Sequence, residues 1–439
     1  MEDITMRKIF QYIMLAVVTI VMASCTSDIE ETTATTGKSN VQLVVGEFPA
    51  FGDSQTRAIG TPDEGKTSWA VGDELLLEMT SKTLGTKYAA FKYNGSSWEL
   101  ASGELSYKED EVPTFPHVYY APNYQWEAGK LVLKEGKVAG TDEYIEGEAN
   151  ITPNGEAITV KFAEATRNYS RLRIATMPNK QITVTINYFT PAGSSNMAWS
   201  QYYALTSDEK GNAYLYGNFV TNSRVDVKYG EAPLATHKFS QATVNAKSYA
   251  LDASIISLAG EGITYNQIEE DVMKELDAGR TYINLMLAPD ADENTFDAIH
   301  SGLQEAKKGS INLTLIGCKK IPSGGFMYWK MLKSIALPDV TEIAEKAFLD
   351  CTRLQKVVLG NLTKVYGKAG EKGIFEGCRT KDIDLVLSKD QKVMNGGKTE
   401  GGYCWTADIT KDYSGSDGHN GRVFLDYDFQ SITCGYPVP

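Results

Sequence analysis

The stretch that decides the fold is residues 332–351, LKSIALPDVTEIAEKAFLDC. Its apolar residues recur in the neighbouring segments at a spacing of 22 residues. Three sets of positions carry this spacing: Leu315, Leu337 and Leu359; Ile321, Ile343 and Val365; Phe326 and Phe348. Each unit exposes an apolar edge that only the next unit can cover, so the repeat predicts coils that stack side by side.

The repeat begins with a longer unit on its N-terminal side. Ile283 and Ile311 stand 28 residues apart in the same Ile-Asn-Leu frame, which predicts one strand-helix coil. A helix is expected before it, capped at Thr264 and ending near Gly279. A second helix is expected inside the coil, with one apolar face made by Phe296, Ile299 and Leu303.

The repeat changes on its C-terminal side. Five extra residues in the Gly/Lys-rich stretch 367–373 place Phe375 and Cys378 27 residues after their counterparts, and the pattern fades into a terminal cap after Leu387. We expect this domain to cover residues 262–439. Its predicted repeat-core residues are Leu337, Ile343, Phe348, Cys351, Leu359, Val365, Phe375 and Cys378.

The central unit closely resembles the BspA-type leucine-rich repeat, LxxIxLPxxVxxIxxxAFxxC. The resemblance covers about three tight coils, and it departs from the pattern where Trp329 stands at the position that Cys351 holds in the next coil. It implies a leucine-rich-repeat solenoid.

The first half of the chain has a different period. From Val41 to about Ala253 it consists of short β-type runs separated by turn residues, with no helical period between them. Turn dipeptides close the runs at Asn94-Gly95, Pro122-Asn123, Asn154-Gly155 and Pro178-Asn179. This pattern predicts an antiparallel β-sandwich over 41–180 and a second short β unit over 181–255. The predicted fold class is therefore multidomain, mainly β plus α/β.

The N-terminus predicts export. An apolar run of about 15 residues, Ile9 to Ala23, follows Arg7-Lys8 and is too short to span a bilayer. The run 21–25, VMASC, resembles a bacterial lipobox, which implies a lipoprotein signal peptide at 1–24 and lipidation of Cys25. An ordinary signal peptide with a coincidental cysteine is the alternative. Residues 25–40 predict a flexible tether.

The acidic cluster after Cys25 bears on localisation. Asp28, Glu30 and Glu31 resemble the surface-export signal of lipoproteins from Bacteroides-type bacteria, and a solvated linker on a periplasm-facing anchor is the alternative. The expected localisation is the cell outer membrane, by a lipid anchor and exposed on the surface.

The first half also resembles the fimbrillin family of pilin-like lipoproteins. The order of motifs carries the resemblance: a lipobox, a first strand, Thr56-Arg57-Ala58, then residues 69–77, WAVGDELLL, and later Tyr119-Tyr120-Ala121-Pro122. In that family an arginine-specific protease removes the first strand, and the open groove accepts a strand from another subunit. The resemblance implies processing at Arg57, although this residue also fits an ordinary surface arginine in a loop. Because the chain ends in a repeat domain and not in a donor-type strand, we expect a tip or accessory subunit of a fimbrium, or a relative that does not polymerise.

Composition and cysteine positions restrict the possible functions. The 439 residues carry a net charge of −13, which argues against nucleic acid, because phosphate binding depends on clustered Lys and Arg. The length predicts several domains. Cys351 and Cys378 are expected to be buried free thiols, because they occupy an interior repeat position. For Cys404 and Cys434, a disulfide and two free thiols both remain open.

Candidate catalytic and ligand-binding motifs are weak. The four histidines, His117, His237, His300 and His419, show no metal-ligand spacing. Lys398-Thr399 ends half a phosphate loop, but Lys392 stands where that loop needs its first glycine. Residues 290–294, DADEN, imitate a calcium loop but lack its glycine, so a helix N-cap is the better interpretation. We expect no enzyme, cofactor or metal.

The expected function is adhesion. A lipid-tethered β unit that carries stacked coils presents a broad, rigid surface, which suits host matrix or bacterial surface proteins, or other pilin subunits. The alternative is a glycan-binding lipoprotein for nutrient capture, with sugars stacked on Trp69, Trp98, Trp126, Trp199 or Trp405. A hydrolase is a third hypothesis, which needs a compact cluster of acids or histidines.

Overall fold

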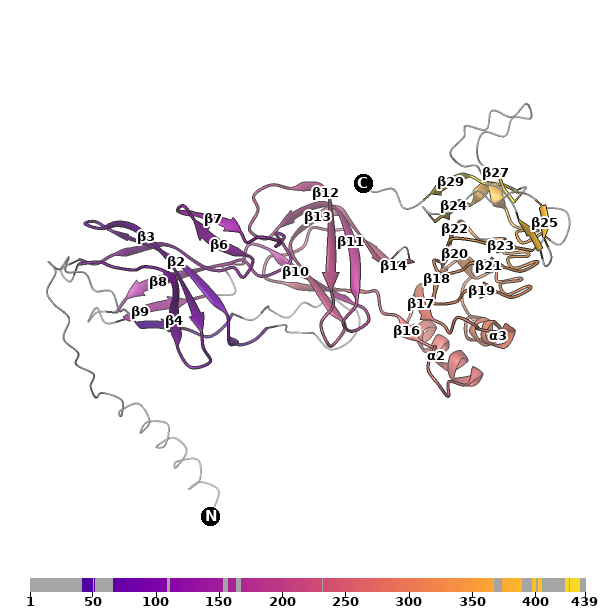
Figure 1. Cartoon of the computed structure of the whole chain (residues 1–439), viewed down its shortest axis with the longest axis horizontal. Helices are drawn as coiled ribbons and strands as arrows, with labels where there is room; N and C mark the ends of the chain where they lie inside the picture. Colours follow the sequence, from indigo (N-terminus) through magenta and orange to yellow (C-terminus); the bar gives the residue numbers. More distant parts are fainter. Residues whose placement is uncertain are drawn as a thin grey trace, which may run out of the picture.

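The structure, a computed structural model, describes residues 42–49, 51, 66–108, 111–152, 157–162, 167–230, 232–366, 373–388, 397–399, 402–404, 423–425 and 427–434. These residues form a mainly β protein of several parts, as expected. Figure 1 shows a barrel, a second sheet and a stack of parallel strands following one another along the long axis. The signal peptide 1–24 and the tether 25–40 lie outside the described residues.

The first part is a closed barrel with the strand order β1-β4-β3-β2-β5-β8-β9. Its strands are β1 (Gln42–Val45), β2 (Glu74–Ser81), β3 (Gly85–Tyr93), β4 (Trp98–Gly103), β5 (Thr114–Tyr120), β8 (Ile145–Ile151) and β9 (Ala157–Lys161). The prediction of a sandwich over 41–180 is therefore wrong. The difference is due to β1. It runs parallel to β9 on one side and pairs with β4 on the other, where Leu43 faces Trp98. It therefore joins the edge strands β9 and β4, which a sandwich would leave unpaired.

A hairpin covers part of the outside of the barrel. It consists of β6 (Tyr124–Glu127) and β7 (Lys130–Leu133). Trp126 and Leu131 from this hairpin pack against a cluster of buried residues on the barrel strands, Leu76, Ala90 and Tyr119. The outer face of β2, β3 and β5 is therefore apolar at this point, as is the face that lines the barrel core.

The second part is a six-stranded sheet whose main path is β12-β11-β13-β10-β15, with β14 paired to β13. Its strands are β10 (Ser170–Ala175), β11 (Gln181–Pro191), β12 (Ala198–Thr206), β13 (Asn212–Tyr229), β14 (Ala232–Lys238) and β15 (Ser248–Asp252). β10 pairs with β13 and β15, so the domain boundary lies before β10 and not at residue 180. Sequence proximity to β9 misled the prediction, because the partners of β10 lie 37 or more residues further along the chain.

The third part is built around a seven-stranded sheet of parallel strands. Its strands are β16 (Ile256–Ser257), β17 (Tyr282–Met286), β18 (Ile311–Ile316), β20 (Leu332–Leu337), β22 (Lys356–Leu359), β24 (Asp384–Leu387) and β29 (Ser431–Cys434). Because β16 belongs to this sheet, the part begins before residue 262, where the sequence placed its start.

The two helices described in the third part are those the sequence predicted. α2 (Tyr265–Asp277) begins at Thr264, whose side chain accepts a hydrogen bond from the amide of Gln267. It ends just before Gly279, which adopts a φ of 74°. α3 (Glu293–Gly302) buries Phe296 and Ile299 against the sheet.

The third part also contains a five-stranded sheet of shorter strands, with the order β19-β21-β23-β26-β25. Its strands are β19 (Lys320–Ile321), β21 (Glu342–Ile343), β23 (Lys364–Val365), β25 (Gly397–Thr399) and β26 (Gly402–Cys404). The remaining elements are η2 (Thr380–Asp382) and the pair β27 (Val423–Phe424) and β28 (Tyr427–Asp428). Each tight coil thus contributes one strand to each of two sheets.

The 22-residue spacing corresponds to one coil of this stack. Leu337 pairs with Leu359, and Ile321 and Val365 lie on either side of Ile343. One equivalent position needs a left-handed backbone in each coil: it is held by Tyr328 with φ 68°, Asp350 with φ 57° and Gly377 with φ 70°. Glycine adopts this backbone conformation at no steric cost, and a Cβ on Gly377 would displace the Asp350 carboxylate, whose nearer oxygen would lie 2.1 Å away.

The six-stranded sheet of the second part, called the second sheet throughout, contacts the parallel stack through buried hydrogen bonds. The amide of Asn284 donates to the carbonyls of Leu234 and Ser254, both at 3.0 Å, and the hydroxyl of Thr314 donates to the carbonyl of Pro233 at 2.7 Å. Ile316 of the stack belongs to the core of the second sheet. These contacts make a packed joint between the two parts.

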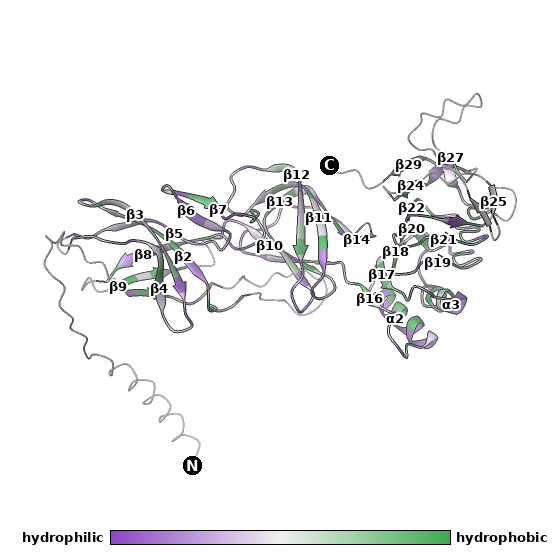
Figure 2. Ribbon diagram, viewed as in Figure 1, coloured by the Kyte–Doolittle hydropathy of each residue, from purple (hydrophilic) through white to green (hydrophobic). Residues whose placement is uncertain are grey.

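Hydrophobic residues are spread over the strands of all three parts (Figure 2). Within the part of the chain that the structure describes, none of the helices has the length and apolar character needed to cross a membrane.

Candidate functional site

Two residues predicted to have a role near the N-terminus, Cys25 and Arg57, lie outside the described residues. The structure does describe β1 and part of the segment that follows it. Phe48 and Phe51 from this segment are each only 6% exposed. The N-terminal segment, defined here as residues 42–49 and 51, is thus held by side chains as well as by the pairing of β1.

Phe48 belongs to the barrel. Its ring meets Trp69 and Tyr120 edge-on, with centroids 4.9 and 5.5 Å apart. The ammonium of Lys66 lies 5.3 Å from the same ring, donates to the Tyr120 hydroxyl and pairs with Asp73. The Phe48 side chain therefore closes one end of the barrel core beneath a charged pair.

Phe51 lies against two arginines at the junction between the barrel and the second sheet. The guanidinium carbons of Arg167 and Arg171 lie 4.1 and 4.6 Å from its ring centroid. Tyr169 and Tyr216 contact the same ring, each with its centroid 6.3 Å away. Arg171 and Tyr216 belong to the second sheet, so the N-terminal segment bridges the two parts.

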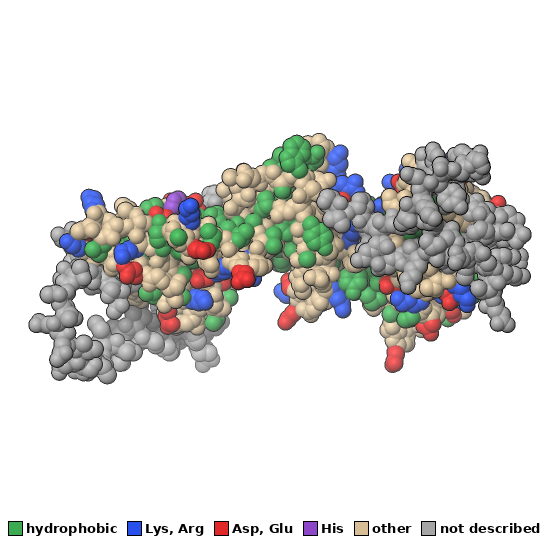
Figure 3. All heavy atoms as spheres, turned by 45° about the horizontal axis from the view of Figure 1, so that its top comes forward, with side chains coloured by type: hydrophobic (Ala, Val, Ile, Leu, Met, Phe, Trp, Pro, Cys, Tyr) green, Lys and Arg blue, Asp and Glu red, His purple; other side chains and the backbone are tan. Residues whose placement is uncertain are grey.

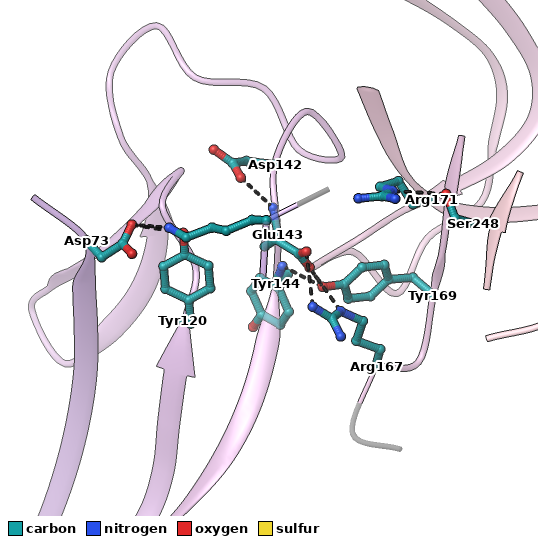
Figure 4. A network of polar contacts seen from close by, with 10 residues as sticks. Asp73, Tyr120, Asp142, Glu143, Tyr144, Arg167, Tyr169, Arg171 and Ser248 are labelled. Carbon is teal, nitrogen blue, oxygen red and sulfur yellow. Dashed lines mark hydrogen bonds and ion pairs between the residues drawn. The ribbon is translucent and has the colours of Figure 1, made fainter. Parts of the chain in front are cut away.

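Arg167, which contacts Phe51, also forms a buried ion pair, shown in Figure 4. Arg167 donates to the two carboxylate oxygens of Glu143 at 3.2 and 3.1 Å, and the side chains are 0% and 5% exposed. The hydroxyl of Tyr169 also donates to Glu143. We call Glu143, Arg167 and Tyr169 the junction triad.

The electrostatics of the junction triad favour its charged form. Burial alone disfavours a charged guanidinium, but Glu143 outweighs it and raises the pKa of Arg167 above its ordinary value. Burial, reinforced by the Glu143 charge, raises the pKa of Tyr169 well above that of a free tyrosine. Arg167 therefore keeps its charge and the Tyr169 phenol keeps its proton across the physiological range, and the triad links Glu143, which precedes β8, to residues that precede β10.

A pocket of about 440 Å³ opens beside the junction. It is lined by Lys66, Arg171, Tyr214, Tyr216 and the turn 208–210. Its charged residues are of both signs, so the pocket does not select a ligand by charge.

The predicted repeat-core residues form one continuous core in the parallel stack. Leu337, Ile343, Phe348, Cys351, Leu359, Val365 and Phe375 are buried in it, and Cys378 is half-buried against it. The rings of Phe326, Phe348 and Phe375 stack face to face, with successive centroids 5.1 and 5.0 Å apart.

The prediction that Cys351 and Cys378 are free thiols is confirmed, and Cys351 is also buried as predicted. Cys351 and Cys378 are free thiols, and each donates to a main-chain carbonyl of the preceding coil, that of Phe326 and that of Phe348, at 2.9 Å. Cys318, which had no prediction of its own, is also free and buried. The side chains of Cys404 and Cys434 lie outside the described residues.

The face of the long parallel sheet that points away from this core carries a row of polar residues. Because side chains alternate along a strand, the residues next to the core positions lie on the opposite face, where Ala336, Val358 and Val386 are buried and the polar residues are half-buried. The row consists of Asn312, Ser334, Lys356, Asp384 and Ser431, which lie opposite one another on successive strands. We call it the outer row. These residues stand at variable positions of the repeat, so nothing in the sequence singled them out. Their alignment in one row becomes visible only from the register of the strands.

The three histidines that the structure describes lie on three different elements. His117 contacts Glu146 on the barrel, His237 lies on β14, His300 lies on α3, and His419 falls outside the described residues. Among the residues described, the structure has no group of three or more His, Cys, Asp and Glu side chains that is arranged to hold a metal ion. Lys398 and Thr399 lie in β25, paired with β26, and not in a loop that precedes a helix.

The residues that resembled a calcium loop form a helix cap, as the sequence predicted. The carboxylate of Asp292 accepts hydrogen bonds from the amide and hydroxyl of Thr295, both at 2.9 Å, and from the hydroxyl of Tyr265 at 2.8 Å. These bonds, the Thr295 amide first, lower the pKa of Asp292 to about 2.

Replacement of the cap should weaken the third part. We expect Asp292→Ala to lower its free energy of unfolding by about 1 kcal/mol at pH 7. The pKa is depressed in the folded state, so this contribution is present above about pH 4 and is lost as the pH falls through 2. Urea unfolding at pH 7 and pH 2 measures both effects, and Asp290→Ala, two residues away, is the control. Equal losses for the two variants would contradict the assignment.

His300 should make the same part sensitive to mild acid. Its ring stacks on Trp329 with centroids 4.9 Å apart, and burial lowers its pKa although Asp297 acts in the opposite direction. The neutral form is favoured in the fold, so its contribution is complete above about pH 6.5 and is lost as the pH falls. We expect His300→Phe to reduce the loss of thermal stability between pH 7 and pH 5. If His300→Phe left the pH profile of thermal stability unchanged, this role would be contradicted. Burial also lowers the pKa of His237, so this residue would then account for the pH dependence.

The tryptophans named for sugar stacking differ in their surroundings. Trp69 and Trp98 pack against the barrel core, and Trp126 packs under the β6–β7 hairpin. Trp199 is 74% exposed, and Trp405 lies outside the described residues.

Sequence reasoning missed the junction triad and its contact with Phe51. Glu143, Arg167 and Phe51 belong to three separate segments, and no local motif links them. A search against protein-family models gives no match for this chain, and a search of curated proteins gives none either.

Proposed function

We propose that the protein is a surface-anchored adhesion lipoprotein, associated with a pilus as a tip or accessory subunit, that binds protein ligands through its stacked coils. In this proposal the third part is a leucine-rich-repeat solenoid of the BspA type, and the first half is fimbrillin-like. Lipidation of Cys25 holds the chain at the outer membrane. The ligands are host matrix proteins, bacterial surface proteins or other pilin subunits.

The observation that carries the proposal is the outer row. It places five polar side chains on successive strands, from Asn312 to Ser431, on a face supported by one continuous core. Polar groups at a fixed spacing on a rigid surface favour recognition of another protein over chemistry, because their positions are set before binding. The packed joint holds that surface in a set position relative to the second sheet.

The N-terminal segment supports a link to pilus assembly. β1 closes the barrel, and the buried rings of Phe48 and Phe51 fill sites that would be open without them. Processing at Arg57 would remove all of these residues together. The exposed edges of β9 and β4 would then accept a strand from another subunit through main-chain hydrogen bonds.

Two measurements test the proposal. Cys25→Ser should abolish incorporation of labelled palmitate and release the protein from the membrane fraction. Binding of the purified chain to immobilised matrix proteins and to a glycan array separates adhesion from the alternative of glycan capture. Binding to matrix proteins without glycan binding is expected, and the reverse result would favour nutrient capture.

A further inference from the structure

The hairpin formed by β11 and β12 carries no charge. Residues 181–206 contain no Lys, Arg, Asp, Glu or His, although 23% of the whole chain is charged. The surface over the middle of the molecule in Figure 3 is correspondingly free of charged side chains over much of its area, in contrast to the barrel. Solvated surfaces of small domains typically carry about a quarter to a third charged residues, so the absence of charge over a whole hairpin favours a contact surface.

β12 is also the edge strand of its sheet. It pairs with β11 on one side, and the described residues provide no strand on the other side. A barrel loop meets the C-terminal end of β12, where the Tyr203 hydroxyl donates to the carbonyl of Ala139 at 3.2 Å, and residues 136–138 and 204–206 line a pocket of about 480 Å³. Natural edge strands are protected by charge, proline or a bulge, and the nine residues of β12 contain none of these.

Large side chains are exposed along this edge. Trp199 is 74% exposed and Tyr202 is 57% exposed, and Met197 and Tyr188 are 44% and 39% exposed. Tyr188 lies at a bulge in β11 with a φ of 59°, which is strained for a bulky residue. The buried hydroxyl of Ser223 donates to its carbonyl at 2.6 Å, so the fold holds this ring outward beside Trp199.

The chemistry of this edge identifies its occupant. A row of main-chain N–H and C=O groups is satisfied best by another extended main chain, and an uncharged edge rejects a charged strand, whose charges would be buried unpaired. β12 itself meets both conditions. Two copies of a chain with a net charge of −13 repel each other over most of their surfaces, and this hairpin is where they meet without burying charge.

We propose that two copies of the protein associate through antiparallel pairing of their β12 strands, centred near Tyr202. The contact is isologous, because each copy uses the same edge. It joins the two second sheets into one, brings the two Tyr202 rings together across the twofold axis, and covers Trp199. Two sets of stacked coils are then presented on one particle, which raises the avidity for a repetitive ligand surface.

Sedimentation velocity of the purified chain over a concentration series tests the proposal. We expect a concentration-dependent dimer and, for Tyr202→Lys, a dissociation constant at least about tenfold higher, because two like charges would face each other at the axis. Val244→Lys is the matched control, since Val244 is 59% exposed in a loop of the same part, and it should leave the dimer unchanged. Equal thermal stability of the two variants shows that each remains folded.

A cross-link fixes the geometry. Tyr202→Cys should form a disulfide between copies under mild oxidation, identified as a 202–202 peptide by mass spectrometry so that the chain's own cysteines do not interfere. A monomer at every concentration would overturn the proposal, as would a dimer that Tyr202→Lys leaves intact. If the monomer binds a glycan through Trp199, the hairpin is a carbohydrate site and the pairing is excluded.

Discussion

Glu143→Ala should lower the free energy of unfolding of the barrel and second sheet by about 3 to 5 kcal/mol. The substitution leaves the Arg167 guanidinium, whose side chain is 0% exposed, without its carboxylate. It also removes the acceptor of the Tyr169 hydroxyl. Pulse-labelling hydrogen exchange in urea measures the effect, because it reports the unfolding of each part separately.

The control for this prediction is Glu146→Ala. Glu146 also pairs with a basic residue, His117, but its side chain is 51% exposed, so the loss should be below about 1 kcal/mol. Protection should fall together in β8 and β10, which belong to different parts, because the junction triad joins them. A loss confined to the barrel would show that the triad does not hold the junction.

Phe348→Ala should lower the free energy of unfolding of the parallel stack by about 3 to 5 kcal/mol. The ring lies between Phe326 and Phe375 with no exposed surface, and the coils on both sides restrict how far the cavity can collapse. Because each coil is stabilised mainly by its neighbours, the loss should spread to the adjacent coils. Hydrogen exchange of β18, β20 and β22 measures it.

Met327→Ala is the control for the aromatic ladder. Met327 lies next to Phe326 but is 36% exposed, and we expect a loss of less than about 1 kcal/mol. If Phe348→Ala affected β20 alone, with normal protection in β18 and β22, the coils would be independent units and the continuous core would not couple them.

The sequence was most informative where structure depends on neighbours along the chain. The spacing between Phe326 and Phe348 predicted the stacked coils because each coil repeats the same local path. The cap at Asp292 was predictable because it is formed by residues within one turn. The free thiols of Cys351 and Cys378 followed from their place in the repeat.

Long-range pairing was not predictable in this way. Sandwiches and barrels share the same short alternating strands, and the four-residue strand β1 decides between them by pairing with β9, over 100 residues away. β10 was assigned to the wrong part for the same reason. The contact of Phe51 with Arg167 and Arg171 depends on how two parts meet, and no local pattern encodes that meeting.

Adhesion of beads coated with the full chain to surfaces of fibronectin, laminin or collagen tests the central claim most directly. The double variant Ser334→Arg, Lys356→Glu changes the outer row without touching the core, and Lys92→Glu, Lys130→Glu is the control on the barrel. The account predicts that the outer-row variant loses at least about nine-tenths of the adhesion that the wild type and the control retain. Equal adhesion of all three proteins, or no adhesion by the wild type, would contradict it.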